Sequence, residues 1–100
     1  METTKECAAL KALGHPECLL ILKILAEREV CVSELVNLTG KRQPYVSQQL
    51  MTLRSANLVI AERRSQSMYY RINFCQLEKL EQIVASLLIH NPALKNSHVR

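Results

Sequence analysis

The stretch of residues 40–72 constrains the fold more than any other part of the sequence, because it combines a helical and an extended periodicity. Val46, Leu50 and Leu53 recur at the i, i+4, i+7 spacing of an amphipathic helix. We expect this helix over residues 43–54, since a proline near its start suits the first helical turn. Two β-prone segments follow it directly. A chain with this stretch must therefore place a helix next to an extended ribbon.

The second half of the stretch predicts a β-hairpin. Residues 58–64 and 67–72 are rich in β-branched and aromatic side chains and are separated by a polar dipeptide. We place the tip of the hairpin at residues 64–67. Leu58 and Ile60 alternate with other residues in the first segment, so we expect both on one face of the hairpin.

Positive charge is concentrated in the same stretch. It carries six basic residues and a single acid, Glu62, which gives a net charge of +5 against +4 for the whole chain. The remainder of the chain therefore sums to −1. Because the basic side chains fall on one helix and on the hairpin next to it, the pattern favours a DNA-binding unit. The basic residues are Lys41, Arg42, Arg54, Arg63, Arg64 and Arg71.

Apolar periodicity predicts four further helices, over residues 3–13, 16–28, 33–39 and 74–90. The second of these is apolar almost all round, so we expect it to be central and buried. Ser33 is the expected N-cap of the third, and Gly40 is its expected left-handed stop. The residues of the third helix that we expect to face inward are Leu35, Val36 and Leu38.

This order of elements predicts a mostly α fold with a small β-hairpin (α+β). Two helices joined by a tight glycine-containing turn form a helix-turn-helix, and the hairpin behind them adds a wing. Residues 30–32 are β-branched around a cysteine and form either a short strand or an extended link. The first and last helices carry more apolar surface than a small core needs. We therefore expect a homodimer in which these two helices pack across a two-fold axis.

Length and composition limit the remaining possibilities. One hundred residues form one domain, which we assign to residues 1–92, followed by a polar tail at residues 93–100. No apolar run approaches the ~18 residues of a membrane span and no secretory pattern is present, so we expect a cytoplasmic protein without membrane contact. The four cysteines lack a CxxC pairing and are expected as free thiols or ligands. With two glycines and no phosphate loop, HExxH or GxSxG motif, the chain is not expected to be an enzyme.

Four motifs in this order resemble the ArsR/SmtB family of bacterial metal- and stress-responsive repressors. Residues 14–16 (GHP) with the following LLILKIL resemble the family's DPxRLxIL opening of the second helix. CVSEL (31–35) resembles its xCVxxL start of the third helix. QPYVSQQLMTLRSANLV (43–59) resembles QxxVSxHLxxLRxAGLV, and YYRI (69–72) is a recurrent end of the family's wing. The resemblance covers about residues 8–88.

The resemblance implies a homodimeric repressor that binds an inverted-repeat DNA operator and leaves it when a ligand or an oxidant binds. It implies that the helix over residues 43–54 enters the major groove, where glutamine can pair with adenine and hydroxyls can reach bases or phosphates. The wing would reach phosphates or the minor groove. A solvated basic face is the alternative interpretation of these residues. The implied DNA-binding residues are Arg42, Gln43, Tyr45, Ser47 and Gln48 on the helix, and Arg63, Arg64 and Gln66 on the wing.

The site that would sense an inducer is only partly present. Arsenic- and cadmium-responsive members of the family carry a CVCxxC run at the start of the third helix, and soft thiolates suit such metals. This chain has Cys31, Ser33 and Val36 at the three cysteine positions. The resemblance leaves Cys31 as a candidate sensing thiol, with Cys7 from the other subunit as the second. Two thiols are incomplete for As(III) but could form a disulfide or bridge a sulfur chain. Of the zinc-ligand positions of related members, only His90 holds a ligand-type residue.

The remaining cysteines have structural interpretations, since Cys18 lies in an apolar helix and Cys75 stands beside Phe74. We expect the first in the core and the second in packing. The sequence thus predicts a DNA-binding repressor that needs no cofactor and responds to a metal or metalloid ion or to a thiol modification. Two alternatives remain open. One is a helical dimerisation or protein-interaction module that binds no DNA, and the other is a DNA-binding family member regulated by its abundance alone.

Overall fold

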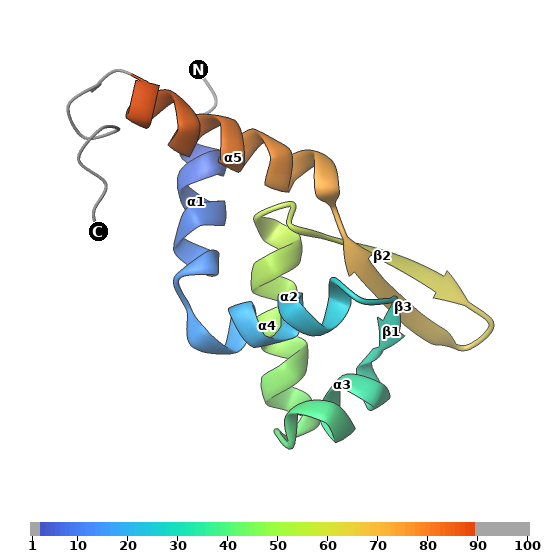
Figure 1. Ribbon diagram of the computed structural model, residues 1–100. Helices are drawn as coiled ribbons and strands as arrows, with labels where there is room; N and C mark the ends of the chain where they lie inside the picture. Colours follow the sequence, from blue (N-terminus) through green and yellow to red (C-terminus); the bar gives the residue numbers. More distant parts are fainter. Residues whose placement is uncertain (1–2, 90–100) are drawn as a thin grey trace.

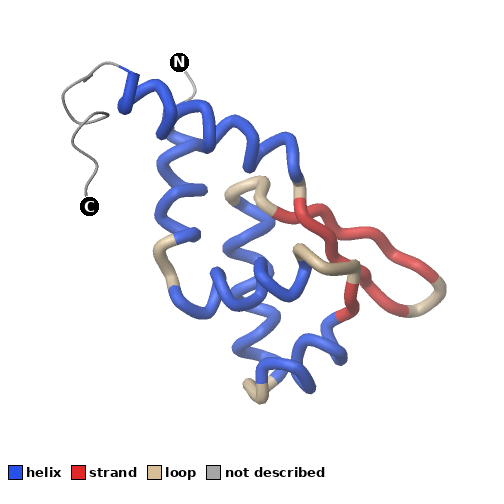
Figure 2. The backbone as a smooth tube through the Cα atoms, in the orientation of Figure 1, coloured by secondary structure: helices blue, strands red, loops and turns tan. Residues whose placement is uncertain are grey.

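The described part of the chain forms five helices and a small antiparallel sheet. The computed structural model describes residues 3–89. Figures 1 and 2 show the helices gathered together and the β-hairpin projecting from them as a wing. This order confirms the winged helix-turn-helix predicted from the sequence. The elements are α1 (Thr3–Leu13), α2 (Pro16–Leu25), β1 (Val30–Cys31), α3 (Val32–Thr39), α4 (Gln43–Ser55), β2 (Val59–Arg64), β3 (Ser67–Ile72) and α5 (Phe74–Ile89).

The core forms where α2 packs against α4. Val46, Leu50 and Leu53 of α4 are each at most 1% exposed, which confirms the predicted inner stripe of this helix. They belong to one hydrophobic cluster with Ile21 and Leu25 of α2. Fully burying a side chain of this size contributes about 1.5–3 kcal/mol. The cluster therefore decides which face of α4 turns inward and which face is left to solvent.

The prediction for α2 is correct in position but wrong in extent. The helix ends at Leu25 instead of residue 28. It is not buried on all sides, because Leu19 and Leu20 are 40% and 39% exposed. Cys18, on its inner side, is fully buried, as expected. The outer side of α2 is left uncovered because the neighbouring elements pack on one side of the helix only.

The sheet is larger than the predicted hairpin. β1 pairs antiparallel with β3, with Val30 opposite Tyr70 and Cys31 opposite Tyr69. The strand order is β1-β3-β2, so the wing is the continuation of a three-stranded sheet. Of the two interpretations of residues 30–32, the short strand is correct. This pairing joins the base of the wing to the start of α3.

The tip of the wing lies where the sequence predicts it, but one facing residue differs. The tip is a two-residue turn inside the predicted range 64–67, and its first residue, Ser65, has a φ of +54°. Ile60 is 36% exposed, whereas Val59 is only 3% exposed. The expected shared face of Leu58 and Ile60 is therefore wrong. Leu58 precedes β2, and Val59 is the first strand residue whose side chain turns to the core.

α3 begins earlier than expected and is less buried. Its N-cap is Cys31 in an extended conformation, so Ser33 is not the N-cap. Gly40 ends the helix with a φ of +72°, as predicted. Leu35 is fully buried, but Leu38 is 53% exposed, which contradicts its expected inward position. Figure 1 shows α3 at the lower edge of the domain, below α4.

Polar side chains tie the start of α5 to the end of α4. The side-chain amide of Asn73 donates to the carbonyl of Asn57 at 2.9 Å. The buried amide of Gln76 donates to the carbonyl of Ala56 at 3.0 Å. Asn57 has a φ of +62°, a conformation that asparagine tolerates better than most residues. The end of α4 is thereby attached to the helix that we expect at the dimer axis.

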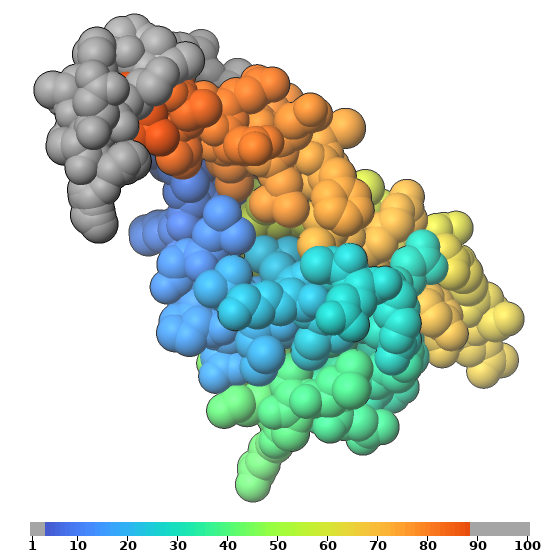
Figure 3. Space-filling view, in the orientation of Figure 1, coloured from blue at the N-terminus to red at the C-terminus, as the bar shows by residue number. Residues whose placement is uncertain are grey.

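An exposed apolar face remains on α5 and α1. Val84, Leu87 and Leu88 of α5 are 49%, 68% and 48% exposed, and Leu10 of α1 is 38% exposed. Figure 3 shows α5 along the upper edge of the molecule, next to α1 and away from the wing tip. An uncovered apolar surface on a small domain marks a contact with another molecule.

Some predictions fall outside the described residues. These are the boundary at residue 92, the polar tail at residues 93–100, and His90. Among residues 3–89, no helix has both the length and the apolar character needed to cross a membrane.

We predict that Gln76→Ala lowers the free energy of unfolding by about 1–3 kcal/mol, because it leaves the buried carbonyl of Ala56 without its donor. Urea unfolding at a fixed protein concentration measures this change. Gln82→Ala is the matched control, since Gln82 is an exposed glutamine on the same helix. Equal stability of the two variants would contradict a structural role for this hydrogen bond.

Candidate nucleic-acid interface

The outer face of α4 carries the residues predicted to bind DNA. Arg42 is the N-cap of the helix, and the side chains of Gln43, Tyr45 and Gln48 are exposed. Ser47 is half-buried beside them. Guanidinium, amide and hydroxyl groups thus stand together at the N-terminal half of a helix whose opposite face is buried. This is the mixture of donors and acceptors that matches base edges and phosphates.

Gln49 of α4 turns inward and has a structural role that sequence analysis missed. Its side chain is 9% exposed, and its Oε1 accepts a hydrogen bond from Sγ of Cys18 at 3.3 Å. Burial, with the nearby charge of Glu17, raises the pKa of the Cys18 thiol, so the thiol keeps its proton and can donate. Two adjacent glutamines look alike until the rotation of the helix is known. One feature of the sequence could have indicated that Gln49 is buried: it lies one residue after Gln48 and close to the predicted apolar stripe.

Arg64 of the wing is held by carboxylates. Its Nη1 lies 2.6 Å from Oε1 of Glu29, and its Nη2 lies 3.1 Å from Oε1 of Glu62. The guanidinium also lies over the ring of Tyr69, 5.2 Å from its centroid. Hydrogen bonds from Arg64 lower the pKa of both Glu29 and Glu62, and these carboxylates raise the pKa of Arg64. All three groups are therefore charged at neutral pH, and the network fixes β2 to the segment before β1.

Other carboxylates reduce the positive charge that the sequence suggests. Lys41 pairs with Glu17 at 3.5 Å, and Arg71 pairs with Glu62 at 3.1 Å. The cations of this stretch for which residues 3–89 provide no carboxylate partner are Arg42, Arg54 and Arg63. The unpaired positive charge is thus concentrated at the N-terminus of α4, at its C-terminal turn and near the wing tip.

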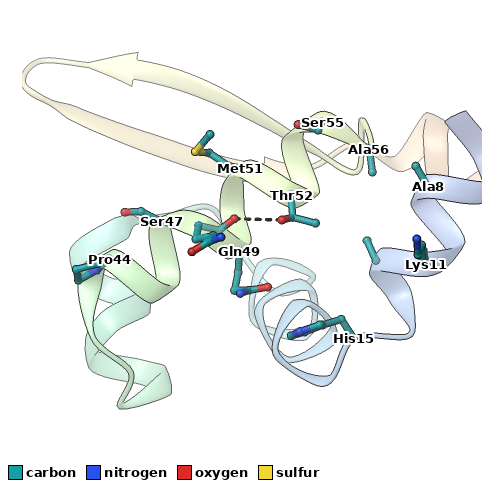
Figure 4. A pocket seen from close by; sticks show the side chains of 12 residues that line it. Ala8, Lys11, His15, Pro44, Ser47, Gln49, Met51, Thr52, Ser55 and Ala56 are labelled. Atoms are coloured by element: carbon teal, nitrogen blue, oxygen red, sulfur yellow. Dashed lines mark hydrogen bonds between the residues drawn. The ribbon is translucent and has the colours of Figure 1, made fainter.

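A hollow of about 850 Å³ lies beside the outer face of α4. Ser47, Gln48 and Met51 of α4 line one side of it, and Lys11 and His15 line the other. Figure 4 shows the two sides, with α1 and the start of α2 facing α4 across an open space. The outer face of α4 is therefore one wall of a concave surface.

The two candidate sensing thiols lie in different parts of the chain. Cys31 is half-buried at the N-terminus of α3, with its Sγ 3.2 Å from Oγ of Ser33. The hydrogen bond with Ser33, and then the backbone amide of Glu34, lower the pKa of the Cys31 thiol. Cys7 is exposed on α1, which Figure 1 shows on the opposite side of the chain from β1. Within one chain the fold does not bring these thiols together.

The ligand-type side chains of the described residues do not gather into a three-ligand metal site. No three His, Cys, Asp or Glu side chains between residues 3 and 89 gather closely enough to hold an ion. Ser33 and Val36 of α3 stand at two of the three cysteine positions of the CVCxxC run, and neither supplies a thiolate. Cys75 is exposed and Phe74 beside it is 63% exposed, so the expected packing role of Cys75 is wrong. Phe74 and Cys75 lie on the outer side of the first turn of α5, whose inner side carries the buried Gln76.

Comparison with known proteins gives the same family as the sequence motifs. Residues 15–61 match the family described as "Bacterial regulatory protein, arsR family". A biofilm growth-associated repressor from Agrobacterium fabrum is 39% identical over 69 residues, which cover 69% of this chain and 59% of that protein. The chain thus spans less than two thirds of the length of this relative.

Solved structures agree with this family. NolR from Sinorhizobium fredii is 32% identical, with a TM-score of 0.68 over 90% of this chain and 87% of that one. The homodimeric winged helix-turn-helix DNA-binding domain of a possible ArsR-family regulator from Mycobacterium bovis is 28% identical, with a TM-score of 0.69 over 98% and 89% of the two chains. The family consists of transcriptional regulators, in agreement with the expectation that the chain is not an enzyme. The chain belongs to the ArsR family of bacterial regulatory proteins.

Proposed function

We propose that the chain is a DNA-binding transcriptional repressor that places α4 in the major groove. The observation that carries this proposal is the division of α4 into a buried apolar stripe and an exposed polar face. In this position the amide of Gln48 can pair with an adenine edge, and the hydroxyl of Ser47 can reach a base or a phosphate. Arg42, Gln43 and Tyr45 would contact the flanking backbone at the start of the helix.

The wing would contact the DNA through the residues near its tip. Arg63 and Gln66 are exposed there, and no carboxylate among the described residues pairs with Arg63. Arg64 has a different role in this proposal, since Glu29 and Glu62 already occupy its guanidinium. We assign it to holding the wing at its angle to the body, with Arg63 as the phosphate-binding cation.

The proposed repressor is a homodimer joined through α1 and α5. The exposed apolar residues of these helices support this arrangement, and the related domain from Mycobacterium bovis is described as homodimeric. A two-fold axis at these helices would present two copies of α4 to the same side. Such a dimer binds an inverted repeat whose half-sites lie about one helical turn of DNA apart. Its place in the cell is the cytoplasm, where bacterial DNA is found.

The signal that we propose for release from DNA is a modification of the Cys31 thiol. Support comes from its lowered pKa and its partial exposure at the start of α3. A complete three-thiolate metal site is not available from the described residues of one chain. Cys7 of the other subunit is the second candidate thiol, for a disulfide or for a bound metalloid ion. DNA binding itself requires no cofactor in this proposal.

Arg63→Gln is expected to weaken binding to a duplex from the protein's own promoter, because each protomer loses a phosphate contact. The slope of log K against log salt should become shallower by about 1.8 for the two copies in a dimer. Fluorescence anisotropy between about 50 and 200 mM salt measures this slope. Arg28→Gln is the control, since Arg28 is exposed and pairs with Glu34 at 2.9 Å, outside the interface. If the folded wild type bound no duplex, the protein-interaction module would replace the repressor as the explanation.

Glu29→Gln should bind DNA more weakly than Glu27→Gln and with a shallower salt dependence, because the wing loses the ion pair through which Arg64 holds it to the body. Glu27→Gln changes the net charge by the same amount at an exposed residue for which the described chain provides no ion pair. The difference between the two variants therefore isolates the release of Arg64. Equal salt slopes for Glu29→Gln and Glu27→Gln would show that the Arg64 network does not influence DNA contact.

Alkylation by iodoacetamide should modify Cys31 at a lower pH in the folded protein than in the urea-unfolded protein, because the folded-state pKa is lowered and the thiolate persists further into acid. Mass spectrometry of quenched samples measures the extent of modification at each pH.

Cys31→Ser should also abolish release from DNA by a persulfide donor. A release that persists in Cys31→Ser would remove this thiol from the mechanism. If the wild type responded to no thiol reagent or metal, regulation by abundance would remain.

A further inference from the structure

The hollow beside α4 has a second wall that the DNA contacts proposed so far do not use. This wall is formed by the end of α1 and the start of α2, and its polar side chains are Lys11 and His15. We call it the α1–α2 corner. In Figure 4 it lies across the hollow from α4. The corner and α4 belong to one rigid body, since Ala9 and Ala12 of α1 are part of the same buried cluster as Leu50 and Leu53.

Lys11 supplies the positive charge of the corner, and both of its polar side chains are available. Lys11 is exposed, and the described residues place no carboxylate within ion-pair distance of it. His15 is the N-cap of α2, but its side chain makes no capping hydrogen bond and is exposed. The acid nearest in sequence, Glu17, is engaged by Lys41 at 3.5 Å. An anion that entered the hollow would therefore meet Lys11 and His15. The Glu17 carboxylate would not compete with it, because Lys41 already pairs with Glu17.

The position of the corner relative to the wing determines what can occupy it. Figure 1 shows α4 between the two, with the wing on one side and α1 on the other. If α4 lies in a major groove, the two phosphate strands that border the groove pass on either side of the helix. The wing would contact the DNA strand on its own side of the groove. The second strand must then pass along the hollow, on the side toward the proposed dimer axis.

We infer that the α1–α2 corner is a second phosphate-binding surface, in which Lys11 and His15 contact the DNA strand opposite the wing. This inference rests on the proposed repressor function and adds a specific contact to it. The open shape of the hollow fits a strand that passes through it. The polar side chains that α4 contributes, Ser47 and Gln48, are the same ones proposed to reach bases, so one continuous surface would span the groove from backbone to backbone.

The experiment measures the salt dependence of binding to a promoter duplex for the full chain. Lys11→Gln should make the slope of log K against log salt shallower by about 1.8, because two protomers each lose one phosphate contact. Lys23→Gln is the matched control, since Lys23 is an exposed lysine on α2 that borders a different groove, with Ile24 and Leu38. It should keep the wild-type slope. Circular dichroism of each variant establishes that the fold is intact.

A second measurement follows the lysine directly. Acetylation of Lys11 by acetic anhydride, measured by mass spectrometry, should be slowed by bound DNA, while acetylation of Lys23 should not change. The inference is overturned if wild-type protein binds DNA with the expected salt slope but Lys11→Gln keeps that slope and Lys11 stays unprotected. Protection of Lys11 by self-association without DNA would also overturn it and would assign the hollow to a second copy of the chain. If the wild type bound no duplex, the proposed function itself would fail first.

Discussion

Burial of Val46, Leu50 and Leu53 against α2 fixes the rotation of α4, and the candidate interface depends on that rotation. Truncating one such leucine to alanine typically costs about 2–5 kcal/mol, a large part of the stability of a small domain. A helix rotated by one residue would bury Gln48 instead of Gln49. The hydrogen bond from Cys18 to Gln49 gives the buried amide a partner only in the observed rotation. Apolar burial and this polar pair therefore favour the same outward face.

Polar contacts attach the neighbouring elements to α4 and limit how they can move. Gln76 and Asn73 connect the start of α5 with the end of α4, and Arg64 connects the wing with Glu29 before β1. The helix that we place at the dimer axis and the wing thus join the same rigid core. The consequence for regulation is geometric. A signal that changed the angle between protomers would move each α4 and its wing together and would change the spacing of the two DNA-binding surfaces.

Much of the fold could be predicted from the sequence, because its elements follow simple local rules. Helical spacing located the inner stripe of α4, and Gly40 and Asn57 marked the left-handed turns on either side of it. The predictions that were wrong depend on tertiary partners that cannot be inferred from a single sequence. Leu38 has the residue type of a core position but lies in a turn that extends beyond the core.

The same limit applies to the candidate site. The composition of residues 40–72 suggested freely available positive charge, but Glu29, which pairs with Arg64, lies 35 residues earlier in the chain. Charge counted within one segment cannot reveal such a partner. Gln49 and the α1–α2 corner were likewise not apparent, since their roles follow from the rotation of α4 and from the approach of α1. Residue types identified the outward face of α4 from the sequence. Which cations lack a carboxylate partner could be identified only from the three-dimensional structure.

The central claim is that the outer face of α4 and the wing form the DNA-binding surface. Amide chemical-shift mapping of the labelled protein, titrated with a duplex from its own promoter, tests this claim most directly. The account predicts that the largest shift changes fall on the first turns of α4 and near Arg63 and Gln66 of the wing. Shift changes confined to the exposed side of α2 around Lys23, or to the exposed end of α3, would contradict it.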